Sequence, residues 1–426
     1  MRLKTSKTAN DQHEVSWSDC YDVPGPDLFE KVAKFAGTAD KARLLFPYFL
    51  RRTVCSANIN RVKMTDPYTG EIREMIMLGS NSYLGLTAHP KVVEAVIAAT
   101  TKYGYGAGSV SLYSGTTDLH IELERRLAEF YRCEDAIIFP TGYAANVGTI
   151  AAILHEQDVA VNDLYNHASI FDGCRLSGAK IQTFAHARMA HLDRVLQESC
   201  GNDHGTLVIT DGVFSMDGDL AKLDEICGLA RKHGARVMLD DSHALGVIGP
   251  TGKGTAEHYG LQGKIDITVG TLSKCFGAIG GVVAGSAELV DYLRFYARPY
   301  FFSGSVPTPV IAGALAILNI MEEQPELRDD LWRSVRHMTT KLSELGFNLG
   351  NTQSAIIPVI IGDESKLKFV LRDLTQAGIF MNYVASPAVP RNKCRLRMSM
   401  MAGHSQKDLD YVIETMEKLG RKYDII

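Results

Sequence analysis

Short apolar runs alternate with longer amphipathic stretches through the middle of the chain. A bounded apolar run of this length is typical of a buried strand, whereas apolar residues spaced three to four apart indicate a helix. Strands are predicted at residues 135–139, 159–162, 181–185, 206–210, 237–240, 267–270 and 280–284. Regular alternation of strands and helices predicts an α/β fold, with a mostly parallel sheet covered on both faces.

The pattern changes on either side of this region. Residues 27–35 have helical spacing, and residues 59–77 alternate around a turn signature at residues 66–70, which predicts a hairpin. Long helices are predicted at residues 310–323 and 405–423, with a smaller α+β region between them. The predicted domains are an N-terminal arm and small segment (1–75), a large domain (76–305) and a small C-terminal domain (306–426).

Composition limits the class of protein. With 426 residues, of which 46% are hydrophobic, the chain can bury a large core, and a net charge of −4 gives no reason to expect nucleic acid as a partner. No apolar run reaches the roughly 18 residues of a membrane span, and the N-terminus lacks the apolar core of a signal peptide. The eight cysteines show no paired metal spacing. We therefore expect a cytoplasmic protein with free thiols, no membrane span and no metal.

Lys274 is the residue that points most directly to chemistry. It lies between small hydroxyl residues and glycines in residues 271–281, directly after an apolar run at residues 265–270. Burial disfavours the charged ammonium, and this cost is relieved if the nitrogen is bound covalently as an imine. The pattern predicts a Schiff-base lysine for pyridoxal phosphate (PLP), with nearby hydroxyls to hold the phosphate. The alternative is a solvated cation in a loop.

Asp240 supplies a second part of such a site. The apolar strand 237–240 ends in Asp240-Asp-Ser-His243, 34 positions before Lys274. A PLP enzyme needs a carboxylate against the pyridine nitrogen, and open α/β sheets bind ligands at the carboxyl ends of their strands. Asp240 is therefore the expected partner of the ring nitrogen, with a helix N-cap as the alternative reading.

Three motifs in order resemble the α-oxoamine synthases, a family of fold-type I PLP enzymes. They are residues 240–243 (Asp-Asp-Ser-His), 249–254 (Gly-Pro-Thr-Gly-Lys-Gly) and 270–274 (Gly-Thr-Leu-Ser-Lys). The resemblance runs from about Met77 to the C-terminus. It implies a fold-type I PLP-dependent transferase with a mostly parallel seven-stranded central sheet and a smaller C-terminal α+β domain. It also implies PLP as the cofactor and a homodimer with shared active sites.

The resemblance places the PLP phosphate at a helix start and at two hydroxyls. Gly142 and Tyr143 follow a predicted strand and open a helix, where free N–H groups and the helix dipole favour an anion. The resemblance implies that both residues contact the phosphate, together with the hydroxyls of Thr271 and Ser273. Ser303 belongs to a segment that, in the family, crosses to the phosphate of the partner subunit.

Other residues are expected around the PLP ring. The resemblance implies that His167 stacks on the ring, and that Ser215 and His243 hydrogen-bond its phenolic oxygen. The predicted catalytic residues are Lys274, His167, Asp240 and His243. Asp217 and Asp219, which follow Ser215, are expected to shape a turn.

An amino-acid substrate needs a group that holds its carboxylate, and arginine suits this through a bidentate fork. Arg395 and Arg397 alternate like a strand and share one face. The resemblance assigns the carboxylate to Arg397, which leaves Arg395 as a solvated residue of the strand face. It also places Asn81 on the substrate side, whereas Tyr83 is expected only to pack.

One position departs from the family. Ser111 stands where the family usually carries arginine, which puts the usual acyl-substrate or gating contact in doubt.

The implied reaction is a decarboxylative condensation of an L-amino acid with an acyl thioester. Lys274 would move the α-proton, and Asp240 would keep the ring protonated so that it accepts charge. The products would be an α-amino ketone, CO2 and a free thiol, from acyl-CoA or an acyl-carrier protein.

The substrates stay open in the sequence. The chain looks most like the bacterial serine palmitoyltransferase-like members, with 8-amino-7-oxononanoate synthase-like members and natural-product synthases as alternatives. An alternative of another class is a fold-type I aminotransferase. Retention of Lys274, Asp240 and His243 argues against a catalytically inactive partner subunit.

Overall fold

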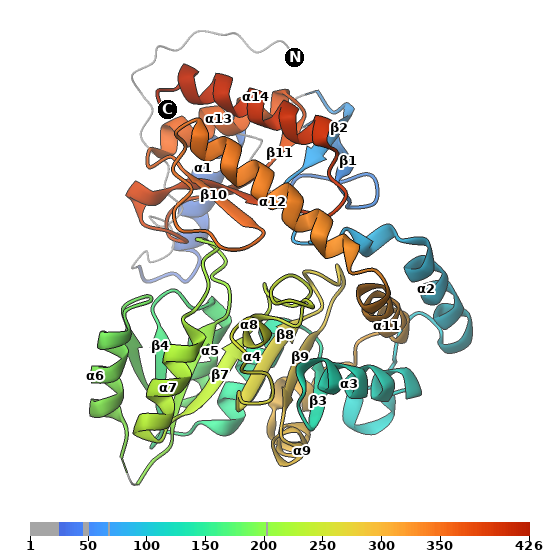
Figure 1. Cartoon of the computed structure of the whole chain (residues 1–426), viewed down its shortest axis with the longest axis vertical. Helices are drawn as coiled ribbons and strands as arrows, with labels where there is room; N and C mark the ends of the chain where they lie inside the picture. The colour runs from blue at the N-terminus through green and yellow to red at the C-terminus, as the bar shows by residue number, and fades with distance from the viewer. Residues whose placement is uncertain (1–24, 46–50, 67–68, 202) are drawn as a thin grey trace.

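A seven-stranded sheet forms the centre of the lower part of the molecule as drawn in Figure 1. The computed structural model describes residues 25–45, 51–66, 69–201 and 203–426, of which 38–45 are described by backbone alone. The strand order is β3-β9-β8-β7-β6-β4-β5, and β9 is antiparallel to both of its neighbours. The strands are β3 (Asp135–Phe139), β4 (Val159–Asp163), β5 (Lys180–Phe184), β6 (Thr206–Asp211), β7 (Arg236–Asp240), β8 (Ile267–Thr271) and β9 (Gly281–Gly285).

Helices cover both faces of this sheet. Because side chains alternate along a strand, Leu207 and Ile209 of β6 pack into one core cluster, and Val208 packs into another on the opposite face. The first cluster includes side chains of α4, α5 and α9, and the second includes side chains of α6 and α7. The helices are α4 (Gly142–Ile153), α5 (Ala168–Ser177), α6 (Met189–Ser199), α7 (Leu223–His233) and α9 (Ala287–Tyr296).

Two three-stranded sheets lie in the upper part of Figure 1, together with the C-terminal helices. One sheet has the order β1-β2-β11 and the other, which is antiparallel, has the order β10-β13-β12. Their strands are β1 (Arg61–Thr65), β2 (Ile72–Met77), β10 (Ile356–Ile360), β11 (Ile379–Phe380), β12 (Asn382–Val384) and β13 (Arg395–Ser399). The accompanying helices are α12 (Glu326–Glu344), α13 (Glu364–Gln376) and α14 (Gln406–Lys422).

The largest hydrophobic cluster joins the central sheet to these upper elements. It contains Ile138 of β3 and Val282 of β9 as well as Leu396 of β13 and Val412 of α14. Further helices complete the fold: α1 (Glu30–Leu45), α2 (Pro90–Tyr103), α3 (Asp118–Tyr131), α8 (Thr255–His258), α10 (Arg298–Phe301) and α11 (Thr308–Glu323). Three single-turn segments are η2 (Leu86–Ala88), η3 (Ser111–Gly115) and η4 (Arg391–Lys393).

The predicted fold class is confirmed by this architecture. Each of the seven predicted strands is present, and its ends differ by at most one residue from the prediction. The predicted hairpin is formed by β1 and β2, although residues 67–68 of its turn lie outside the described residues. Helix α1 starts three residues later than predicted and runs ten residues further, to Leu45, through a stretch rich in helix-forming alanine, lysine, arginine and leucine. The domain boundaries stay a prediction.

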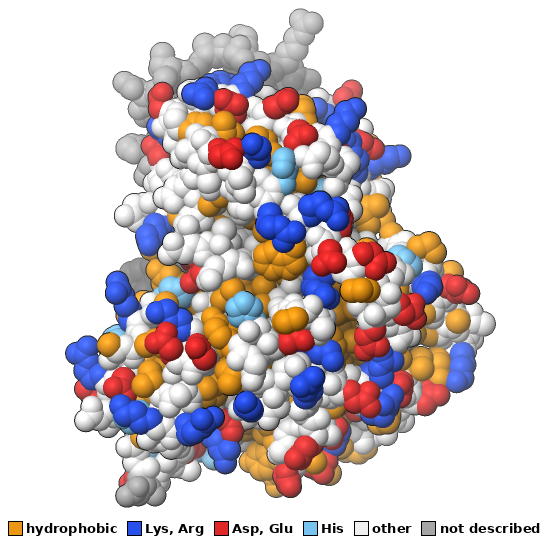
Figure 2. Space-filling view, in the orientation of Figure 1, with side chains coloured by type: hydrophobic (Ala, Val, Ile, Leu, Met, Phe, Trp, Pro, Cys, Tyr) orange, Lys and Arg blue, Asp and Glu red, His pale blue; other side chains and the backbone are white. Residues whose placement is uncertain are grey.

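The surface carries charges of both signs. Figure 2 shows Lys and Arg side chains interspersed with Asp and Glu over the face in view, without a field of a single sign. Within the described parts of the chain, no helix combines the length and the apolar character that crossing a membrane requires.

Candidate active site

The carboxyl ends of the central strands converge on one cavity of about 300 Å³. Asp211 ends β6 and Asp240 ends β7, and these two residues are direct register partners in the sheet. Thr271 ends β8, and the segments after β3 and β4 bring Gly142 and His167 to the same place. This edge of an open α/β sheet is where ligands bind.

Asp240 is held in a fixed orientation. Its side chain is buried, with the residue only 5% exposed. One carboxylate oxygen, Oδ2, accepts a hydrogen bond from Asn146 Nδ2 at 2.6 Å, and Oδ1 accepts one from the Ser242 N–H at 3.0 Å. Asn146 also bonds Ser169 Oγ at 2.9 Å. Neither Asn146 nor Ser169 was predicted from the sequence, because only the packing of α4 against α5 brings them beside Asp240.

Lys274 lines the same cavity, in the turn after β8. Burial lowers the pKa of its amine to about 8, against the opposing effect of the Asp240 and Asp211 carboxylates. Burial, together with the charge of Asp240, raises the pKa of Asp211 well above its usual range. An amine with a pKa near neutrality can act as a nucleophile and can also accept and return a proton.

Two histidines face the cavity as neutral rings. His167 precedes α5, and its Nδ1 lies 2.7 Å from Ser169 Oγ. Burial lowers the pKa of His167, and burial together with the charges of Lys274 and Arg397 holds the pKa of His243 well below its usual range. A neutral imidazole can pack against an aromatic ring and can donate or accept one hydrogen bond on each nitrogen.

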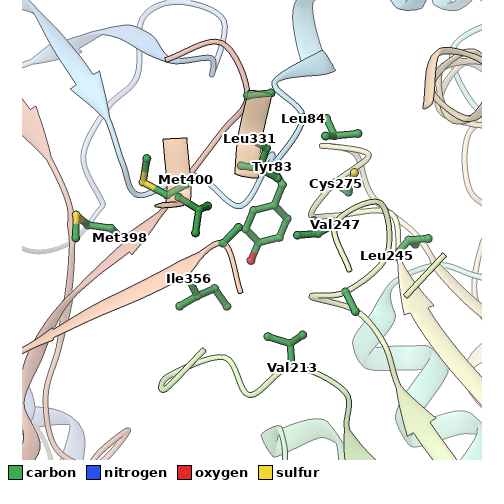
Figure 3. Close-up of a cluster of buried hydrophobic side chains, with 14 of the residues drawn as sticks. Tyr83, Leu84, Val213, Leu245, Val247, Cys275, Leu331, Ile356, Met398 and Met400 are labelled. Carbon is green, nitrogen blue, oxygen red and sulfur yellow. The ribbon is translucent and has the colours of Figure 1, made fainter. Parts of the chain in front are cut away.

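Tyr83 does more than pack. Figure 3 shows its ring among apolar side chains that include Leu84, Val247 and Ile356. Its hydroxyl lies 2.7 Å from His243 Nδ1. Burial raises the pKa of Tyr83 to about 12, so the phenol keeps its proton and can donate it to Nδ1 of the neutral imidazole. The expectation that Tyr83 only packs is therefore wrong, because its hydroxyl shares a hydrogen bond with Nδ1 of His243.

The other end of the cavity suits an anion. Helix α4 begins at Gly142, and the first N–H groups of a helix have no partner within the helix. A Cβ atom at Gly142 would lie 2.8 Å from Thr271 Oγ1, so glycine lets the helix start approach β8 closely. Thr271 Oγ1 lies 2.9 Å from Ser273 Oγ, which adds two hydroxyls to this end. Tyr143 lines the cavity as well, and its hydroxyl bonds Asp172.

Arg397 joins three parts of the chain. It is buried on β13, and its Nε donates to the Ser215 carbonyl oxygen at 2.5 Å. Its Nη1 donates to Asn81 Oδ1 at 3.1 Å and to Ser399 Oγ at 2.9 Å. Ser215 lines the cavity, whereas Arg397 and Asn81 are not among its lining residues, and Arg397 is connected to it through the Ser215 carbonyl oxygen. The structure thus brings together the two residues predicted for substrate binding.

The prediction that Arg395 is a solvated residue is wrong. It is 1% exposed, and its Nη1 forms an ion pair with Asp217 Oδ1 at 2.8 Å. The reason is that β13 is the central strand of its sheet, with partners on both sides and cover on both faces. Asp217 and Asp219 were expected only to shape a turn, but their side chains pair with other elements: Asp219 Oδ2 lies 2.8 Å from Nε2 of His186.

Two predicted positions lie away from the cavity. Ser303 precedes Gly304, which forms a β-bridge with Val110, and Ser303 is not among the residues that line the cavity. Ser111 begins η3, and its carbonyl oxygen accepts a hydrogen bond from Thr116 Oγ1 at 2.8 Å. The roles predicted for these two positions stay predictions.

The residues of the cavity fit PLP. Lys274 offers the amine for a covalent bond, Asp240 offers a carboxylate for the ring nitrogen, and the helix start with Thr271 and Ser273 offers donors for a phosphate. In addition, Asn146 Oδ1 is buried without a hydrogen-bond partner among the described residues, as expected in a site shaped for a polar ligand. When bound, PLP supplies an electron sink for charge that develops on the α-carbon of an amino acid. Across the described ranges, no group of His, Cys, Asp and Glu side chains is arranged to hold a metal ion.

Known proteins resemble this chain over most of its length. The family model "Aminotransferase class I and II" matches residues 73–416. An 8-amino-7-oxononanoate synthase of Thermoanaerobacter pseudethanolicus is 45% identical over 354 residues, which cover 83% of this chain and 90% of that protein.

Solved structures show the same likeness. The serine palmitoyltransferase of Sphingomonas wittichii superposes with a TM-score of 0.89 at 32% identity, covering 94% of this chain and all of that one. A structure of SPT with PLP superposes with a TM-score of 0.87 at 33% identity, covering 94% of this chain and all of that one. The chain therefore belongs to the class I and II aminotransferase family and, within it, to the PLP-dependent α-oxoamine synthases.

Proposed function

We propose that this protein condenses a small L-amino acid with an acyl thioester and releases the thiol and CO2 to give an α-amino ketone. The observation that carries this proposal is the placement of Lys274 and Asp240 in one cavity, with the buried guanidinium of Arg397 hydrogen-bonded to the carbonyl oxygen of Ser215, which lines that cavity. The cavity of about 300 Å³ must hold both the cofactor ring and the amino acid, which leaves little room for a large side chain. Serine and alanine are therefore the first amino acids to test.

Each polar group has a proposed part in this reaction. Lys274 binds the cofactor covalently and, once released, takes the α-proton and later returns one to the product. Asp240 keeps the ring nitrogen protonated, and Asn146 holds the carboxylate in position for this. Arg397 orients the carboxylate of the amino acid, supported by Asn81.

The remaining predicted residues surround the cofactor. His167 packs on the ring, and His243 and Ser215 act at its phenolic oxygen, with the Tyr83 hydroxyl holding His243 in position through Nδ1. The phosphate is held by a group of residues at the opposite end of the cavity: Gly142, Tyr143, Thr271 and Ser273.

We also propose a homodimer in the cytoplasm, with active sites shared between subunits. Tyr105, Tyr113 and Phe302 are 90%, 76% and 68% exposed, which is unusual for large aromatic side chains on a monomer. Tyr113 and Phe301 form an edge contact with ring centroids 6.4 Å apart, and Phe301 contacts Phe302, so the exposed rings of Tyr113 and Phe302 lie in one region. Ser303 belongs to the same region, and a second subunit that covers it places Ser303 near the partner's cofactor.

The proposed reaction predicts equal amounts of CO2 and free thiol from an amino acid and an acyl thioester. The purified enzyme is incubated with each amino acid and with palmitoyl-CoA or a shorter acyl-CoA, and both products are measured together. Serine with a long acyl-CoA is the first pair to test, because the sequence favours serine palmitoyltransferase-like substrates. Formation of a 2-oxo acid without thiol release contradicts the proposal and indicates an aminotransferase.

Replacing Arg397 with alanine is expected to weaken binding of the amino acid. Binding of the acyl donor should change less. A charge-assisted hydrogen bond contributes about 1.5–3 kcal/mol, so the apparent dissociation constant should rise roughly 10- to 100-fold. Titration of the cofactor absorbance with amino acid measures this constant, and a melting curve checks that the buried site still folds. Arg397→Lys keeps the charge but not the two-pronged guanidinium. Its dissociation constant for the amino acid should lie between those of the unmodified enzyme and Arg397→Ala. An unchanged dissociation constant in Arg397→Ala means that another residue holds the carboxylate.

A further inference from the structure

A tight turn, residues 213–220, brings Ser215 to the cofactor cavity. The first and last residues of this turn pair through a β-bridge, and the Phe214 N–H donates to the Asp219 carbonyl oxygen at 3.0 Å. Ser215 is assigned to the phenolic oxygen of PLP. The position of the 213–220 turn therefore decides where this hydroxyl lies relative to the cofactor.

Strand β13 holds the turn from one side. Arg395 Nη1 donates to the Met216 carbonyl oxygen at 3.0 Å and to Asp217 Oδ1 at 2.8 Å. Arg397 Nε donates to the Ser215 carbonyl oxygen at 2.5 Å. These contacts attach the tip of the turn to the C-terminal part of the chain, but they do not reach the side chain of Asp219.

His186 holds the turn from the other side, where it connects the turn to the central sheet. Its Nε2 lies 2.8 Å from Asp219 Oδ2, and its Nδ1 lies 3.1 Å from Oδ1 of Asp163, the last residue of β4. The ring stacks on Tyr165 and makes an edge contact with Phe214, with ring centroids 4.4 Å apart in both pairs. The imidazole is therefore fixed by two hydrogen bonds and by two aromatic neighbours.

The charge of His186 suits this position. Burial alone would lower its pKa, but the hydrogen bonds to Asp163 and Asp219 outweigh burial and raise the pKa to about 9. The ring is then a cation near neutral pH, and both of its nitrogens donate to carboxylates. A neutral imidazole has a single N–H and would leave one of the two contacts without a donor.

The backbone beside His186 is also unusual. Ala187 has a φ of +55°, which is uncommon for a residue with a side chain, and its N–H donates to Asp163 Oδ2 at 3.3 Å. Such a conformation persists where the surrounding structure requires it. The chain thus bends sharply after β5 toward the end of β4, which brings the His186 ring between Asp163 and Asp219.

We propose that His186 is a positioning residue: by bridging Asp163 and Asp219 it fixes the 213–220 turn to the central sheet, and so places Ser215 at the phenolic oxygen of PLP. This inference rests on the proposed role of Ser215. His186 is not among the residues that line the cavity, so it acts through the turn and not on the reactants.

Two substitutions separate the two contacts of His186. The amide nitrogen of His186→Asn can replace Nδ1 and keep the bond to Asp163, whereas that of His186→Gln can replace Nε2 and keep the bond to Asp219. Both variants remove the ring and its charge. Deuterium uptake by residues 213–220 is measured in the full-length enzyme, with and without PLP. Loss of a charge-assisted hydrogen bond should make uptake at least roughly tenfold faster in His186→Asn, and clearly less fast in His186→Gln.

His233→Asn is the matched control. His233 Nε2 lies 2.7 Å from Asp193 Oδ1, so this variant removes a histidine–aspartate pair of the same kind between α6 and α7. Its uptake in residues 213–220 should equal that of the unmodified enzyme. The inference is overturned if both His186 variants change uptake equally, or if neither changes it.

The absorbance of bound PLP tests whether His186 acts through Ser215. Ser215→Ala and His186→Asn should each shift the pH at which this absorbance changes, in the same direction and by roughly half a pH unit or more, because both remove a hydrogen bond from the phenolic oxygen. His186→Gln should shift it less. In the Ser215→Ala background, His186→Asn should add no further shift, since the two residues then act as one unit.

Two results would contradict this action through Ser215. A further shift in the double variant means that His186 affects the cofactor by another route. No shift in Ser215→Ala means that the role given to Ser215 is wrong, and the positioning role of His186 falls with it. Neither result bears on the condensation itself, which thiol release tests separately.

Discussion

The Lys274→Ala enzyme is expected to form no covalent adduct with PLP and to lose at least roughly a thousandfold in turnover. Lys274 is the amine that lines the cavity beside Asp240, and burial lowers its pKa to about 8. It is assigned both the covalent bond and the proton transfer, and general acid–base catalysis alone contributes about 10²–10⁴-fold. The measurement is borohydride reduction followed by mass spectrometry of the digested protein, together with thiol release under saturating substrates.

Lys264→Ala is the matched control, because Lys264 is an exposed lysine ten positions earlier in the chain. It should keep both the adduct and the activity. A pyridoxyl group found on another lysine of the unmodified enzyme would disprove the assignment of Lys274.

The Asp240→Asn enzyme should still fold and still bind PLP, but its kcat should fall by about a hundredfold or more. The amide has nearly the same shape as the carboxylate and can keep a contact with the Ser242 N–H. It carries no negative charge, so the ring nitrogen is no longer held protonated and charge on the α-carbon is less stabilised. Steady-state kinetics measure the loss, and absorbance of the bound cofactor shows that binding persists.

Asp266→Asn is the control for this experiment. Asp266 lies beside the start of β8, on the edge of the sheet opposite the cavity, where it pairs with Arg236. Its replacement should leave kcat unchanged within about twofold. Activity of Asp240→Asn within roughly tenfold of the unmodified enzyme, about 1.4 kcal/mol of barrier, would rule out the role given to Asp240.

Local patterns were enough to predict the strands and the residues that end them. Asp240 ends a buried strand, and Lys274 and Gly142 each follow one. Because carboxyl ends of neighbouring strands meet at one edge, the centre of the site could be predicted. The strand order was not predictable in this way, because the position of β9 between β3 and β8 depends on pairing between distant segments.

The residues that the sequence did not reveal act through contacts between distant elements. Asn146 contacts Asp240 across 94 positions, and Tyr83 contacts His243 across 160 positions. Neither residue carries a local pattern that separates it from an ordinary packing residue. Arg395 was misjudged because alternation along β13 shows which residues share a face but does not show that both faces are covered.

The hydrogen bond between Arg397 and Asn81 has a consequence for how the protein is made. It joins residues that are 316 positions apart. Protein chains leave the ribosome from the N-terminus, and their domains generally fold in that order. A nascent chain that has reached residue 281 already contains every residue that lines the cofactor cavity, but β13 has not yet been synthesised. The growing polypeptide therefore acquires the groups for its cofactor more than a hundred residues before it acquires the guanidinium assigned to its substrate.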